Sequence, residues 1–307
     1  MPVEKIIETV ADDIKIDLQE EVVTEVEEGN DSNKNRTLNL PEGELLLPKN
    51  MIWQDGTVHC KTDNTQMVLI PSGQFSMGSE ERPTENPVHN VYLDNYLIDI
   101  YPVTNSQYSK FLNYIRATNN HSKCHPEEPK NKDHTPKFWQ TNEYRKYSNE
   151  ENCPVIFIDW WDAWAYASWA NKKLPSEAQW EKAARGSDSR KYPWGSEDVN
   201  EKLANYSNNF GYTTQVGLFP DGSSPYGCMD MAGNVWEWCM DTYERNFYRE
   251  CPSNNPVCLT TKPARSLRGG SWNDGRASLR ATARGCWINI VRYSYIGFRC
   301  VYDLKKE

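Results

Sequence analysis

The stretch MVLIPSGQFSMGSEERPTENPVHNVYLDNYLIDIYPVTNSQYSKFL, residues 67–112, carries the plainest structural pattern of the chain. Its first part, MVLIPSGQFSMGS, is typical of two strands joined by a Pro-Ser-Gly turn, and VYLDNYLIDIYPV continues the alternation. At its end, Thr104 and Gln107 have the spacing of a capping box, in which each residue's side chain accepts the other's backbone N–H. The pattern therefore predicts strands that give way to a helix after Thr104.

Two further helices are predicted downstream. Ser176 and Gln179 repeat the capping box, and Gly186 is a suitable residue to end the helix that follows. Between the two boxes, residues 162–170 have the Ala-rich, aromatic pattern of a packed helix. After Gly186, Gly, Asn and Ser separate short aromatic segments, which predicts short strands and long ordered loops. The expected fold class is α+β with little regular secondary structure.

Length and charge limit the classes of protein. With 307 residues, 12 Trp and 17 Tyr, the chain is long and aromatic enough to bury a large core. A net charge of −9 repels phosphate backbones, so nucleic acid is not expected as a partner, and no apolar run is long enough to span a membrane. Residues 1–45 form an acidic segment or linker, and the main domain is expected over 46–307. The compartment stays open: the cell surface or secretion if an export signal or lipid anchor has been removed, and otherwise the cytoplasm.

The spacings of the cysteines and histidines contain few of the patterns that are typical of metal sites or disulfide frameworks. The nine cysteines include no CxxC pair, and Cys251 and Cys258 are either buried free thiols or, in an oxidising setting, a disulfide. The only metal-like spacing is His121, Cys124 and His125, but the surrounding EEPKNKDHT favours a solvated loop over a metal site. The chain has no GxSxG, Walker loop, HExxH or GxGxxG motif, so the common hydrolase and nucleotide sites lack their parts.

The motif GNVWEW, residues 233–238, has oxygen ligands for a hard cation. Side-chain oxygens and backbone carbonyls in this tight turn suit calcium. The candidate ligands are Ala232, Gly233, Asn234, Val235 and Glu237. The alternative is that the two Trp side chains fill the core and that Glu237 pairs with a nearby Arg.

Four segments together resemble the formylglycine-generating enzyme (sulfatase-modifying factor) family. They are residues 67–112, 153–186 and 226–238, and RSLRGGSWN with IGFR within 265–299. The resemblance covers most of residues 65–303, and it implies the C-type lectin-like fold of that family with structural calcium. It implies one calcium site at the turn 232–237 and a second at Asn205 and Tyr206, where the completing loop is shortened to NNFGYTT.

The chemistry of the family does not carry over with the fold. By the resemblance, the family's oxidase binds copper through two cysteines shortly after its GGS-aromatic motif, because thiolate is a soft ligand. Here Trp272 is followed by Asn273 and Asp274, and the next cysteine is Cys286. Related sulfoxide synthases take iron-binding histidines from an extra N-terminal helical domain that residues 1–65 do not supply. The sequence therefore predicts no catalytic residues, no copper or iron, and no enzymatic activity.

A third group of this fold gives a closer resemblance. Residues 267–299 resemble the C-terminal variable region of the variable proteins of diversity-generating retroelements, such as a Treponema variable protein. Adenine-directed mutation of Asn codons cannot produce Lys, Glu, Gln, Met or Trp, and residues 263–304 contain no Lys, Glu, Gln or Met. Trp287 is the one candidate variable position that does not fit. Tyr and Trp give large, rigid contact area, as in antibody loops. The alternative is a buried strand pair over 285–295.

The prediction is a non-enzymatic protein that displays a diversified recognition surface to a protein or other macromolecular ligand. The predicted ligand-binding face consists of Asn273, Asp274, Gly275, Ala277, Ser278, Ala283, Gly285, Cys286, Trp287, Ile288, Ile290, Val291, Tyr293, Ser294 and Tyr295. The alternatives are an inactive structural homologue and a divergent metal-dependent oxidase of the same family. That oxidase would use a site that the family does not have, such as His121, Cys124 and His125.

Overall fold

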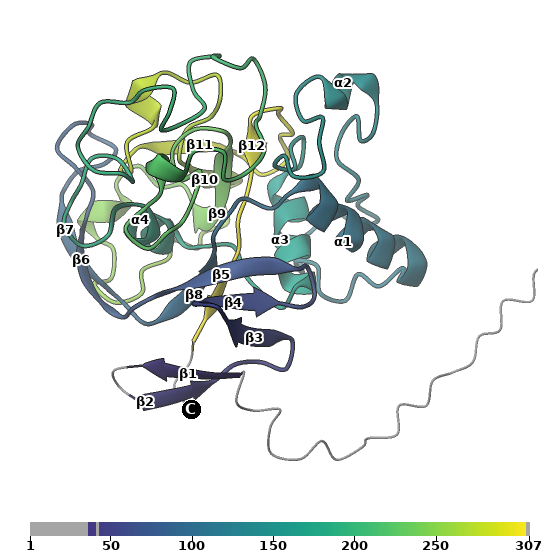
Figure 1. Cartoon of the computed structure of the whole chain (residues 1–307), viewed down its shortest axis with the longest axis horizontal. Coiled ribbons are helices and arrows are strands. Elements are labelled where there is room, and N and C mark those ends of the chain that lie inside the picture. Colours follow the sequence, from purple (N-terminus) through teal and green to yellow (C-terminus); the bar gives the residue numbers. More distant parts are fainter. Residues whose placement is uncertain (1–35, 41–42, 305–307) are drawn as a thin grey trace, which may run out of the picture. The chain divides into compact units, whose positions relative to one another are not determined.

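The strands form two larger sheets and two hairpins (Figure 1). The computed structural model describes residues 36–40 and 43–304. The larger sheet is antiparallel throughout, and it pairs the last strand of the chain with one from the 67–112 stretch. Its order is β13 (Val301–Asp303), β8 (Tyr96–Asp99), β5 (Thr65–Ile70), β4 (Thr57–Cys60) and β3 (Met51–Gln54).

The second sheet brings the family-like motifs side by side. Its order is β11 (Arg284–Ile288), β10 (Ala264–Arg268), β9 (Trp236–Thr242) and β12 (Ile296–Gly297). Strand β12 runs parallel to β9, so IGFR lies beside GNVWEW, and β10 pairs with β9 on its other side. The two strands predicted on either side of the Pro-Ser-Gly turn are present: β5 ends at Ile70 and β6 (Gly73–Met77) follows. They belong to different sheets, because β6 pairs with β7 (His89–Leu93).

The three predicted helices are present. In α1 (Asn105–Thr118) and α4 (Glu177–Arg185), both capping boxes form as predicted. Helix α3 (Trp160–Trp169) begins earlier than predicted, because Asp159 caps it and Asp162 closes a third capping box. A short helix, α2 (Asn142–Arg145), was not predicted. In Figure 1, α1 lies against α3, where Tyr108 stacks on Tyr166 with ring centroids 5.7 Å apart.

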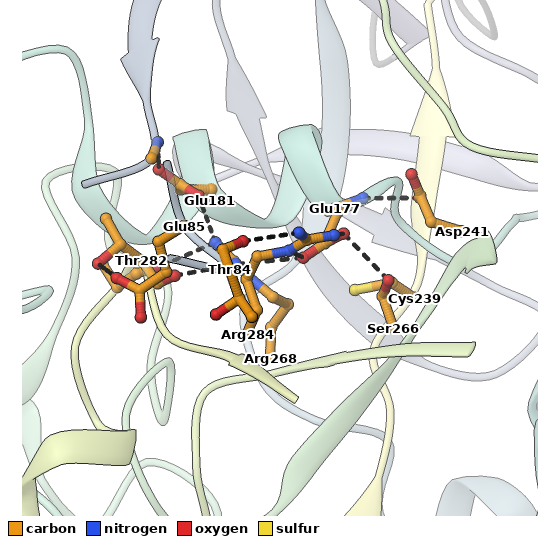
Figure 2. Close-up of polar contacts among 12 residues, drawn as sticks. Thr84, Glu85, Glu177, Glu181, Cys239, Asp241, Ser266, Arg268, Thr282 and Arg284 are labelled. Atoms are coloured by element: carbon orange, nitrogen blue, oxygen red, sulfur yellow. Dashed lines mark hydrogen bonds and ion pairs between the residues drawn. The ribbon is translucent and has the colours of Figure 1, made fainter. Parts of the chain in front are cut away.

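Buried ion pairs hold α4 against the second sheet (Figure 2). The Glu177 carboxylate lies between Arg284, whose Nε donates to Oε1 at 2.6 Å, and Arg268, whose Nη1 donates at 3.3 Å. Arg268 also donates to Glu181. Beside them, burial and the neighbouring Glu177 carboxylate raise the pKa of Asp241 to about 7. Fully buried charges of this kind require partners, and here each carboxylate has them.

The folded unit starts before the predicted boundary at residue 46. The compact unit runs from residue 35, and β1 (Thr37–Leu40) pairs with β2 (Gly43–Leu46) inside it. Leu38 is buried in the same apolar cluster as Leu47 and Met51. Apolar packing therefore extends into residues 36–40 and 43–45, which belong to the segment that was interpreted as a linker. The predicted appendage before residue 35 lies outside the described residues.

Within the part of the chain that the structure describes, no helix is both long enough and apolar enough to cross a membrane.

Candidate metal centre

The loop between α1 and α2 brings four metal-binding side chains together. The candidate donor atoms of His121, Cys124, Glu128 and His134 all lie within 4.8 Å of one another. The His134 Nε2 atom lies 3.4 Å from Cys124 Sγ and 3.4 Å from Glu128 Oε1, and Cys124 Sγ lies 3.9 Å from His121 Nδ1. Donors around a tetrahedral metal ion with bonds of about 2.0–2.3 Å lie roughly 3.3–3.8 Å apart. The spacing therefore suits a shared ion.

Local turns present these donors to one another. The Cys124 N–H donates to the His121 carbonyl at 3.0 Å, and the Glu128 N–H donates to the His125 carbonyl at 2.9 Å. The rings of His121 and His134 lie nearly parallel, with centroids 5.7 Å apart. Since His121 is exposed and His134 is buried, the group opens to solvent on the His121 side.

A buried carboxylate orients His134. The Asp162 Oδ1 atom lies 3.1 Å from His134 Nδ1, so Nδ1–H donates to Asp162 and Nε2 points toward Cys124 and Glu128, where a metal ion would replace the Nε2 proton. Burial lowers the pKa of His134, but the hydrogen bonds to Asp162, Cys124 and Glu128 outweigh it and raise the pKa to about 11. A carboxylate behind a ligating histidine is the usual outer-shell arrangement of a metal site.

One oxygen of Glu128 indicates that the group lacks a partner. Its Oε2 atom is buried and accepts no hydrogen bond from the described residues. An unsatisfied buried carboxylate oxygen costs free energy unless a cation or water approaches it. The group thus combines two imidazoles, a thiol and a carboxylate with an unmet acceptor.

The third residue of the predicted set, His125, does not join the group. Its ring packs against Trp160, Trp161 and Trp164, with centroids 4.7–5.5 Å away. Glu128 and His134 take its place, and both lie in the polar stretch that had favoured a solvated loop. The sequence does contain these ligand types, but they are distributed from His121 to His134 and do not form a compact motif.

The GNVWEW turn has the contacts of the alternative interpretation. Both oxygens of Glu237 accept from Arg299, at 2.7 and 2.8 Å, and Oε2 also accepts from Trp180 Nε1. Asn234 Oδ1 accepts from Asn205 and from the Thr214 N–H. These side chains, as placed, do not fit calcium, because a guanidinium already occupies the carboxylate. Calcium at the turn stays a prediction that metal analysis can test.

Of the fifteen residues of the predicted face, seven are exposed, seven are half-buried and one is buried. Trp287, Ile288 and Ile290 are 42%, 45% and 59% exposed, and Tyr293 stacks on Tyr295 at 5.1 Å. Ala283 is an exception: it is buried and does not belong to this face, because the chain enters β11 from the interior there. The surface therefore exists, and its binding role stays a prediction.

No thiol lies where the family's copper ligands are expected. Asp274 stands two residues after Trp272, and its Oδ2 accepts from Trp236 Nε1 at 2.9 Å and from Ser271 Oγ. Cys286 is exposed on β11. All nine cysteines are free, and Cys251 Sγ lies 3.1 Å from His89 Nε2 instead of bonding to Cys258.

The chain belongs to the family described as the sulfatase-modifying factor enzyme 1-like domain, whose model matches residues 55–304. This confirms the family predicted from the four segments. The α+β, C-type lectin-like fold is confirmed as well, by the similar solved structures described below.

Three relatives illustrate the range of the family. The serine/threonine-protein kinase pkn1 of Chlamydia caviae is 34% identical over 94% of this chain and 46% of its own length. The formylglycine-generating enzyme of Thermomonospora curvata is 32% identical over 77% of this chain and 93% of its own length. The hercynine oxygenase of Mycolicibacterium smegmatis is 29% identical over 91% of this chain and 70% of its own length. This chain spans about half the length of the chlamydial relative, so a kinase activity cannot be assigned to it.

Two solved structures share the fold. PvdO from Pseudomonas aeruginosa superposes with a TM-score of 0.64 at 26% identity, over 82% of this chain and 99% of PvdO. The Treponema denticola variable protein 1 superposes with a TM-score of 0.58 at 22% identity, over 78% and 95% of the two chains. The second likeness bears on the fold alone.

The prediction of a non-enzymatic display protein is wrong, and so is the prediction that the chain is no enzyme. Relatives named as a formylglycine-generating enzyme and an oxygenase cover 77% and 91% of this chain. The error came from treating the missing thiol pair as a loss of all catalysis. Its absence removes one ligand set and leaves other sets open.

Proposed function

We propose that the chain is an oxygen-dependent oxidase of this family, with an iron(II) ion bound by His121, Cys124, Glu128 and His134. The observation that supports the proposal is the meeting of these four donors within 4.8 Å. The aromatic surface formed by exposed Trp287 and half-buried Tyr293 and Tyr295 lies in the same domain and would supply the substrate contacts.

The donor types favour a transition metal over calcium or magnesium. Imidazole nitrogen and thiolate sulfur are softer ligands than the oxygens that calcium and magnesium prefer. Two histidines with one carboxylate are also the ligands of non-haem iron oxygenases, which keep coordination positions open for dioxygen. The relative named hercynine oxygenase supports redox chemistry on this fold.

Anaerobic reconstitution tests the proposal. We expect the full chain to bind one iron per molecule, and nitric oxide, used in place of dioxygen, to give the high-spin EPR signal of an iron–nitrosyl centre. Oxygen consumption by the iron-loaded protein is then measured with cysteine and with hercynine, the compound in the mycobacterial relative's name. Elemental analysis of the same sample reports calcium, copper and zinc.

Two variants make the test specific. His134→Ala removes a buried ligand, and we expect loss of both the iron and the nitrosyl signal. His125→Asn is the matched control: this residue lies beside the ligands but packs on tryptophans, and Asn can still accept the Glu127 N–H that His125 Nδ1 accepts at 3.1 Å. Tightly bound zinc that iron cannot replace, with no nitrosyl signal, would contradict the oxidase and indicate a structural ion.

A further inference from the structure

Arg292 connects the C-terminal segment to the loop that carries the metal ligands. Its Nη1 donates to the Thr135 carbonyl at 2.9 Å, and its Nη2 donates to the Asp133 carbonyl at 3.1 Å. These two carbonyls flank His134 in the chain. A planar guanidinium with fixed donor directions therefore holds the backbone on both sides of the buried ligand.

The same guanidinium holds the carboxylate that orients His134. Arg292 Nη2 lies 2.8 Å from Asp162 Oδ2, and the other oxygen of Asp162 faces His134 Nδ1 at 3.1 Å. Arg292 Nε also donates to Asp159, the N-cap of α3, at 3.0 Å. Lys132 approaches both carboxylates, at 2.7 and 3.0 Å, so the two buried acids face two cations.

We propose that Arg292 is a positioning residue of the metal centre, which holds His134 and Asp162 in the geometry that metal binding requires. The inference rests on the metal centre proposed above. It gives a role to a side chain that is 157 residues from Thr135 in the chain and touches none of the four ligands directly. Outer-shell partners of this kind commonly change metal affinity by about 10–100-fold when they are replaced.

The position of Arg292 also connects the centre to the aromatic surface. The next residue, Tyr293, stacks on Tyr295, and its ring centroid lies 5.2 Å from that of Trp287. A molecule that binds against these rings contacts the chain directly beside the positioning residue. The positioning residue is thus adjacent in the chain to the aromatic surface.

Cobalt(II), added alone to the full chain, is the probe, because its visible absorption reports both affinity and ligand geometry. We expect Arg292→Gln to weaken cobalt binding about 10–100-fold and to change the absorption spectrum. Arg292→Lys keeps the charge but loses the fork, so it is expected to recover part of the affinity. Arg276→Gln removes an exposed arginine of the same segment and is expected to leave both readouts unchanged.

The outcomes separate the inference from the proposed function. Wild-type protein that binds no cobalt would overturn the metal centre itself. Wild-type protein that binds cobalt, with unchanged affinity and spectrum in both Arg292 variants, would overturn only the role of Arg292. Circular dichroism checks that each variant is folded, and if Arg292→Gln is not, Arg292→Lys alone decides. A purely structural role would lower the melting temperature without altering the cobalt spectrum of the folded protein.

Discussion

Two polar clusters of this protein differ in how their atoms are satisfied. In the cluster on α4, the Glu177 carboxylate accepts hydrogen bonds from Arg268, Arg284 and Ser266, so each of its oxygens has a partner. In the cluster on residues 121–134, Cys124 and one oxygen of Glu128 share the Nε2 atom of His134, and the other oxygen of Glu128 is buried without a partner among the described residues. In the first cluster every carboxylate oxygen of Glu177 has a partner, whereas in the second one carboxylate oxygen is left for a bound cation to contact.

The difference separates polar groups that stabilise the fold from groups that are available for chemistry. Replacing a buried carboxylate that is paired with two arginines destabilises the fold, because it leaves buried positive charges without a partner. A group of candidate metal ligands with an unpaired oxygen can gain from an ion, because ion binding to the folded state adds to the free energy of unfolding. The following predictions test this contrast, from the largest expected effect to the smallest.

Glu177→Gln is expected to have the largest effect. It leaves Arg268 and Arg284 without their shared carboxylate, so the free energy of unfolding should fall by about 3–5 kcal/mol, as measured by urea titration. Glu201→Gln, which changes an exposed residue, is the matched control and should stay within about 0.5 kcal/mol. A loss below about 1 kcal/mol for Glu177→Gln would show that the network does not stabilise the fold.

Glu85→Gln should cost somewhat less, about 3 kcal/mol at pH 7, and its cost should depend on pH. Burial raises the pKa of Glu85, but the hydrogen bonds and charge of Arg280, together with Ser79 and Thr282, lower it below the ordinary value. The stabilisation is present above the ordinary glutamate pKa and is lost as the pH falls through the lowered value. Unfolding titrations at pH 7 and pH 3 should show the difference between wild type and variant shrinking with acid. A constant difference would contradict this assignment.

Metal addition should have an effect of intermediate size. At cobalt(II) concentrations about 100 times the dissociation constant, the free energy of unfolding of the wild type should rise by about 2.7 kcal/mol. His134→Ala should show no such rise, and His125→Asn should show all of it. Equal stabilisation of His134→Ala would mean that the ion binds elsewhere.

Ile290→Ala should have the smallest effect. The side chain is 59% exposed, so the free energy of unfolding should change by less than about 0.5 kcal/mol. Ile296→Ala, in the same segment but fully buried, should cost about 2–5 kcal/mol through lost packing. Similar costs in chemical denaturation would place Ile290 in the core and remove the proposed surface.

Local signals predicted the secondary structure well. The capping boxes at Thr104 and Ser176 formed as predicted, because each depends on residues three positions apart. The box at Asp159 was missed, because its two aspartates flank Trp160 and Trp161, which have the pattern of core residues. The strand pair of β1 and β2 was missed as well, because polar residues surround the few apolar side chains that pack there.

The sequence by itself determined the family, the starts of α1 and α4 and the absence of the thiol pair, since these depend on residue order and on contacts between near neighbours. Only the tertiary structure decided that His134, and not His125, lies beside Cys124. His125 is adjacent in sequence but turns onto the tryptophans of α3, while His134 is held by Asp162, which lies 28 residues further along the chain. Arg292, 133 residues beyond Asp159, then closes the same group. Contacts over such separations depend on how helices and loops pack, and no local spacing in the chain encodes them.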